Sequence, residues 1–95
     1  MARKAKEIFT EPGDIARIER LVTELPQHAH VRITLRNGDV MEGSVVERPT
    51  VQVFEDDACD QGINALVRID DVSTPPQSLY LWLGDIERID RLDTA

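Results

Sequence analysis

The chain has 95 residues, of which 41% are hydrophobic and 31% are charged, and its net charge is -7. This length suits one domain and is too short for two. No apolar run approaches the ~20 residues that a membrane span needs, and no apolar stretch follows the basic first residues to make a signal peptide. A single cysteine excludes an internal disulfide. We therefore expect a soluble, cytoplasmic protein.

An N-terminal helix is the first element that the pattern predicts. We expect residues 1–9 to form a flexible N-terminus and residues 10–95 to form a single domain. Thr10 can cap the helix, Pro12 suits an early helical position, and Pro26 ends it. The helix carries one apolar stripe, formed by Ile15, Ile18, Leu21, Val22 and Leu25.

The hydrophobic period changes from helical spacing to two at Val31. Apolar and polar residues alternate over residues 31–36, which is typical of a half-buried strand. Asn37-Gly38 predicts a hairpin turn, because both positions tolerate positive φ. The sequence therefore predicts that the chain reverses here into a second, antiparallel strand.

The returning strand is expected to run over residues 39–48, with Met41 and Val45 facing the core. Gly43 lies in the middle of this strand. A glycine inside a strand usually weakens a sheet, but it is expected where a strand bends sharply to close a small barrel. We therefore expect the bend at Gly43.

The second half of the chain contains short apolar runs separated by turns. Residues 50–54 and 65–69 form either two strands or one interrupted strand, with a polar, acidic loop over residues 55–64. Residues 74–76 form a stiff connector. Later elements are expected from the alternating residues Leu79, Leu81 and Leu83, the Gly84-Asp85 turn, and Ile86, Ile89 and Leu92. One helix followed by five or six short strands indicates a small barrel.

Residues 31–47 read Val-Arg-Ile-Thr-Leu-Arg-Asn-Gly-Asp-Val-Met-Glu-Gly-Ser-Val-Val-Glu and resemble the first Sm motif, with Gly38, Met41 and Gly43 at matching offsets. Residues 81–89 resemble the second Sm motif loosely. The resemblance, to a divergent, uncharacterised bacterial family of Sm-like proteins, implies a mostly β fold of the α+β type. Its expected form is an N-terminal helix followed by a strongly bent, five-stranded, antiparallel, SH3-like barrel.

The resemblance also implies RNA binding, but the positions that carry it differ. In the family, an acidic residue and an asparagine follow the second glycine by seven and ten positions, and counting from Gly43 gives Thr50 and Val53. The Arg or Lys before the second-motif glycine is Leu83 here. Residues 55–71 hold six acidic side chains against one arginine, which disfavours a phosphate backbone. RNA is therefore the alternative function, with Arg36, Asn37 and Arg68 as its candidate contacts.

Self-association is the first expectation for function, because Sm-like subunits pair the exposed edges of their late strands. The expected product is a homo-oligomer, either a dimer or a small ring, and another protein partner is a further option; no membrane is expected. The candidate interface residues are Leu79, Tyr80, Leu81, Trp82, Leu83, Ile86 and Arg88. Tyr80 and Trp82 face outward if the leucines face the core. They then form an interface, stack on bases, or lie partly buried under the helix or the acidic loop.

No pattern in the sequence predicts an enzyme, a metal site or a cofactor. His28 and His30 would share a strand face, but a closed metal site needs three or four ligands. The acidic residues 55–60 lack the ordered spacing of a calcium loop. Cys59 has no neighbouring His or Lys to activate it. The prediction is a non-enzymatic interaction module.

Overall fold

A five-stranded antiparallel sheet forms the larger part of the structure, a computed structural model that describes residues 3–71 and 77–92. The strand order is β7-β6-β3-β2-β8, so β7 and β8 are the two edges. The sheet's elements are β2 (His30–Leu35), β3 (Val40–Val45), β6 (Leu66–Asp71), β7 (Ser78–Trp82), the short 3-10 turn η1 (Leu83–Asp85) and β8 (Ile86–Arg91).

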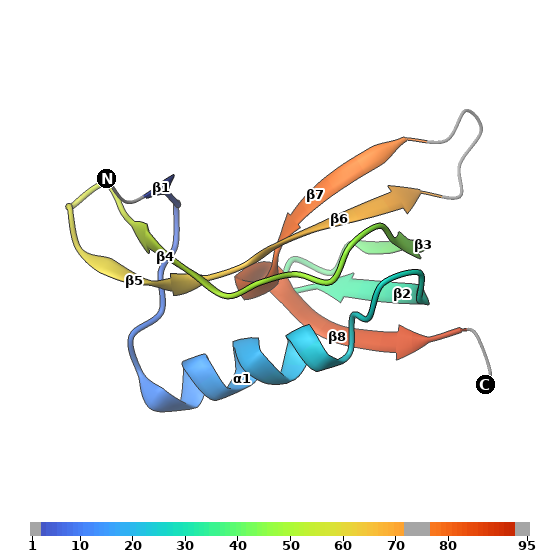
Figure 1. Ribbon diagram of the computed structural model, residues 1–95, viewed down its shortest axis with the longest axis horizontal. Helices are drawn as coiled ribbons and strands as arrows, with labels where there is room; N and C mark the ends of the chain where they lie inside the picture. The colour runs from blue at the N-terminus through green and yellow to red at the C-terminus, as the bar shows by residue number, and fades with distance from the viewer. Residues whose placement is uncertain (1–2, 72–76, 93–95) are drawn as a thin grey trace.

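A second, three-stranded sheet contains β1 (Arg3–Lys4), β4 (Gln52–Glu55) and β5 (Gln61–Asn64) in the order β1-β4-β5. Figure 1 shows these short strands gathered at one end of the molecule, while β7 and β8 diverge from η1 toward the other end. Residues 50–54 and 65–69 thus supply two strands in two different sheets. The polar segment 55–64, expected to be a loop, contains strand β5, and only the residues between β4 and β5 form the loop.

Helix α1 (Pro12–Thr23) carries the apolar stripe into the core, where Ile18, Leu21, Val22 and the following Leu25 are buried. The expectation that Thr10 caps the helix is wrong, because Glu11 occupies the cap position and no side chain caps the helix. Pro12 explains this shift, since a proline holds the residue before it in the extended conformation that Glu11 adopts.

The N-terminal segment that we expected to be flexible is packed from residue 3 onward; residues 1–2 lie outside the described residues. Arg3 and Lys4 pair in parallel with Phe54 and Glu55 of β4. Phe9 is buried, and its backbone exchanges two 2.9 Å hydrogen bonds with Ile63. The structure therefore corrects the flexible assignment for residues 3–9, because pairing with a distant hairpin orders them.

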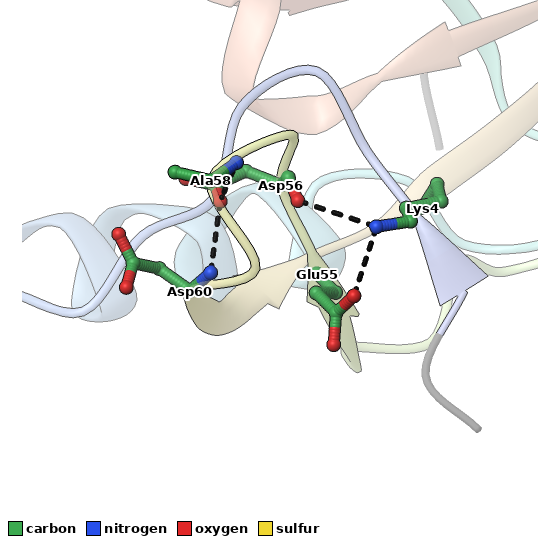
Figure 2. A network of polar contacts seen from close by, with 5 residues as sticks. All are labelled: Lys4, Glu55, Asp56, Ala58 and Asp60. Atoms are coloured by element: carbon green, nitrogen blue, oxygen red, sulfur yellow. Dashed lines mark hydrogen bonds and ion pairs between the residues drawn. The ribbon is translucent and has the colours of Figure 1, made fainter.

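Lys4 ties this segment to the acidic hairpin (Figure 2). Its ammonium group donates to the Glu55 carboxylate at 2.8 Å and to the Asp56 carbonyl at 3.5 Å. The bond to Glu55 raises the pKa of Lys4 above 10.5, with smaller contributions from the attraction of Asp57 and Asp56. Because the pair is exposed, salt screens it and its effect on stability is small.

The hairpin between β2 and β3 confirms the turn predicted at Asn37-Gly38, with Gly38 at φ 95°. Asn37 Oδ1 accepts the Asp39 backbone N–H at 2.9 Å and fixes the turn. Val45 is buried and Met41 packs against the core, as predicted. The connector expected over residues 74–76 lies outside the described residues.

Gly43 approaches β6 so closely that a side chain would not fit. A Cβ atom there would collide with the Asp70 carbonyl oxygen and lie 2.6 Å from Ile69 Cγ2. The close approach to β6 therefore explains the glycine in this strand, while the bend predicted at Gly43 stays a prediction. No pairing between β7 and β8 is found among the described residues, so the strand order does not show the closed barrel that the resemblance implied.

Candidate functional site

The two edge strands carry most of the residues predicted to form an interface. Tyr80 is 67% exposed, and Leu79 and Leu81 on the same strand are half-buried. Arg88 on β8 is exposed, and its guanidinium lies 3.3 Å from the Asp90 carboxylate. The structure thus places these side chains at the two edges of the larger sheet.

Leu83 and Ile86 are both 0% exposed and belong to the core. Their prediction as interface side chains is wrong for the folded chain. The turn η1 redirects the backbone between β7 and β8, so both residues point inward where the chain changes strand. Both side chains belong to the core that supports the two edge strands.

Trp82 and Tyr80 differ in their surroundings. They lie on the same face of β7, two residues apart, but the Trp82 ring packs edge-on against Phe54 of β4, with the ring centroids 5.0 Å apart. Phe54 is 2% exposed. Partial burial, which the sequence left open, therefore applies to Trp82, under β4, while Tyr80 faces solvent.

The three candidate RNA contacts do not come together. Arg36 and Asn37 lie at the β2–β3 turn and line one hollow with Asp85, whereas Arg68 lines a different hollow beside Tyr80. The Asn37 side chain is already bonded within its turn. An Arg36 nitrogen lies 3.7 Å from the Glu7 carboxylate.

Asn64, a buried polar side chain that sequence reasoning missed, joins the N-terminal segment, the beginning of β6 and the turn η1. Asn64 is 1% exposed, and its Oδ1 accepts the backbone N–H groups of Ala65 at 2.8 Å and Gly84 at 3.1 Å. Its Nδ2 donates to the Glu7 carbonyl at 3.0 Å. Val53, the position reached by counting from Gly43, is instead 55% exposed on β4.

Val53 lies on the hairpin of β4 and β5, which is inserted between β3 and β6. This hairpin lengthens the connection between β3 and β6, which the count from Gly43 assumed to be short. The available signal was the pair Ile63-Asn64 directly before the alternating strand that begins at Ala65.

A hollow of about 430 Å³ opens beside Asn64 and contains two cations, two carboxylates and one aromatic wall. It is lined by Lys6, Glu7, Arg36, Asn64, Trp82 and Asp85. The cations and carboxylates balance, and the Asn64 amide is committed to the backbone. The hollow therefore offers a ring to stack on but no excess of positive charge.

The side chain of Arg17 supports the turn next to this hollow. Its guanidinium donates to the Ile86 carbonyl at 3.0 Å and lies 5.7 Å from the centre of the Phe9 ring. The Phe9 ring in turn lies so close to Gly84 that a Cβ there would collide with it. The helix, the N-terminal segment and η1 are therefore held together at one point.

The histidines and the acidic loop show no metal site. His30 Nε2 lies 3.0 Å from a Glu42 carboxylate oxygen but lacks hydrogen-bond geometry, and His28 is exposed. In the part of the chain that the structure describes, no three His, Cys, Asp or Glu side chains are grouped to hold a metal ion. Cys59 is exposed and free. None of the described helices is long and apolar enough to span a membrane.

An Sm-like protein is the class that the helix, the sheet order and the Gly43 approach together define. The chain belongs to the family described as domain of unknown function DUF3247, whose model matches residues 2–92. It is similar to XC5848 from Xanthomonas campestris, whose crystal structure is described as a novel variant of the Sm-like motif. The two are 30% identical, with a TM-score of 0.92 over 98% of this chain and 100% of that one. No curated protein matches the chain.

Proposed function

We propose that this protein is a non-enzymatic module that associates with copies of itself through the edge strands β7 and β8. The observation that carries the proposal is the strand order, in which these two strands end the sheet and no described strand lies beyond either of them. An open strand edge presents unpaired backbone donors and acceptors, which a second chain can complete.

The hydrogen-bond pattern shows which groups the β7 edge presents. Leu83 N donates to Ala65 O, and Asp71 N donates to Gln77 O, at the two ends of the β6–β7 ladder. Because bonded and non-bonded pairs alternate along antiparallel strands, the backbone groups of Tyr80 face away from β6. Tyr80 thus offers an aromatic side chain and a free strand edge at the same residue.

Strand β8 supplies a second edge. Leu92 N donates to His30 O, and the same alternation directs the backbone groups of Ile89 away from β2. The two edges diverge from η1, as Figure 1 shows, and β7 is not paired with β8 in the described residues. A neighbouring chain could pair with either edge, which is compatible with a dimer or a small ring.

Replacing Tyr80 by lysine tests this proposal. We expect the wild-type protein to run as a dimer or larger species in size exclusion with light scattering. The dissociation constant of the oligomer should rise roughly tenfold or more in the variant, because a charge replaces an exposed aromatic anchor.

The matched control is Val40→Lys, which changes another exposed apolar residue, 58% exposed, on the central strand β3. It should leave the mass unchanged. A wild-type protein that stays monomeric at the highest soluble concentration would refute self-association.

RNA binding is the second candidate, favoured by the presence of Trp82 and Arg36 in one hollow. We expect uridine-rich and adenine-rich oligonucleotides to bind weakly or not at all, even at low salt, because the charges of the hollow cancel and the chain carries -7. Fluorescence anisotropy at two salt concentrations measures this. Tight, salt-sensitive binding that Arg36→Gln abolishes would make RNA binding the better assignment.

A further inference from the structure

A gap interrupts the larger sheet beside the first half of β6. Strand β3 pairs with β6 only over residues 43–45, and one further bond joins Val46 N to Arg68 O at 3.0 Å. The chain then leaves the sheet over residues 47–51. Among the described residues, the beginning of β6 therefore has β7 on one side and no strand on the other.

The backbone of β6 points into this gap. The Arg68 carbonyl faces it, since it accepts the Val46 N–H. The alternation of antiparallel pairs directs the N–H and carbonyl groups of Leu66, two residues earlier, to the same side. Because the Arg68 carbonyl is already bonded, the gap presents the backbone donor and acceptor of Leu66 to an extended chain.

A hollow of about 320 Å³ lies beside the gap, and its mostly polar lining includes two guanidinium groups. The half-buried Leu66 also lines it, and the exposed Tyr80 is paired with Arg68 on the neighbouring strand. The residues that line it are Val46, Glu47, Arg48, Pro49, Thr50, Gln52, Leu66, Arg68 and Tyr80.

The two arginines are available to an anionic ligand. Arg68 donates one bond to the Ser78 hydroxyl at 3.0 Å, and Ser78 donates to the Asp70 carboxylate at 2.7 Å, so the guanidinium is held in place with other donors free. Arg48 makes no hydrogen bond or ion pair with any described residue. Glu47 is the one carboxylate among the lining residues, so the hollow is locally positive in an acidic chain.

We infer that this hollow binds a short, extended, acidic peptide segment of a partner protein. The strand edge would bond its backbone, Leu66 and Tyr80 would contact alternate apolar side chains, and Arg48 and Arg68 would bind its carboxylates. A peptide fits better than a nucleic acid, because a peptide backbone can pair with the Leu66 edge of β6, which a polyphosphate backbone cannot do. The peptide would use a different strand edge from the one proposed for self-association, since the gap lies on the side of β6 opposite β7, but Tyr80 contributes its ring to both.

The test uses a fluorescein-labelled peptide of alternating glutamate and valine, measured by anisotropy against the full chain. We expect it to bind, the same peptide with lysine for glutamate not to bind, and the double variant Arg48→Gln/Arg68→Gln to bind about tenfold more weakly. Arg48→Gln alone, which breaks no internal contact, should show part of this loss. The matched control Arg20→Gln/Arg32→Gln removes two exposed arginines elsewhere and should bind as wild type.

Three results would overturn the inference. The first is failure of the acidic peptide to bind the wild-type chain, and the second is binding by the Arg48 and Arg68 variants as tight as that of the wild-type chain. The third is displacement of the peptide by a uridine oligonucleotide that binds more tightly. The last would assign the hollow to nucleic acid. Light scattering on the same variants should show an unchanged mass, which separates this result from the outcome for self-association.

Discussion

Replacing Gly43 by valine is expected to destabilise the protein by about 3 kcal/mol or more. The added Cβ would collide with the Asp70 carbonyl oxygen and lie 3.0 Å from the Asp70 carbonyl carbon. These are backbone atoms of β6, so no side chain can rotate away. Strand β3 cannot retreat either, because its other side is paired with β2 from His30 to Thr34.

Urea unfolding, followed by Trp82 fluorescence and circular dichroism, measures this effect. The control is Gly13→Ala in α1, where nothing lies within 4 Å of the added Cβ. That substitution should stabilise the protein by about 0.5–1 kcal/mol, because alanine has the higher helix propensity. A Gly43→Val variant as stable as Gly13→Ala would contradict the close approach of β3 and β6.

The elements that the sequence predicted well are those whose own periodicity determines their packing. Helix α1 and strands β2 and β6 each present a regular apolar pattern to one core, so local sequence and tertiary contacts agree. The Gly43 approach could be predicted for the same reason, because the glycine interrupts a strand that is otherwise regular.

The N-terminal segment and β5 could not be predicted in this way. Strand β1 has only two residues, both exposed, and its conformation depends on pairing with β4, about fifty residues away. Strand β5 is polar because it belongs to a small, half-exposed sheet with little apolar surface to bury. Order that comes from distant pairing leaves no local hydrophobic pattern.

The candidate site was predicted in part. Alternation placed Tyr80 on an exposed face, and it is exposed. Alternation cannot show that a second hairpin covers the next position on that face, as Phe54 covers Trp82. Asn64 was missed, because its burial and its bonds depend on Glu7 and Gly84, which are distant from it in the sequence.

Asn64→Leu is the second substitution with a large expected effect. It removes the acceptor for the Ala65 and Gly84 N–H groups and the donor to the Glu7 carbonyl, all at a site that is 1% exposed. Each polar group left buried without a partner costs about 1–3 kcal/mol, so we expect a loss of about 3 kcal/mol or more in the same urea experiment. A loss below that of an exposed substitution such as Val53→Thr would show that water replaces these bonds.

Asn64→Asp separates the acceptor role of this side chain from its donor role. The carboxylate keeps an acceptor for Ala65 and Gly84 but places negative charge against the Glu7 carbonyl in a buried site, which raises the pKa of the new carboxyl group. The native state then binds a proton more tightly than the unfolded state, where an aspartate titrates near about 3.9. The variant's deficit relative to wild type should therefore be small at low pH and grow as the pH rises from the unfolded to the folded pKa. A variant as stable as wild type at every pH would show that the Nδ2 donor bond to Glu7 contributes little, and that Asn64 acts only as the acceptor that connects Ala65 to Gly84.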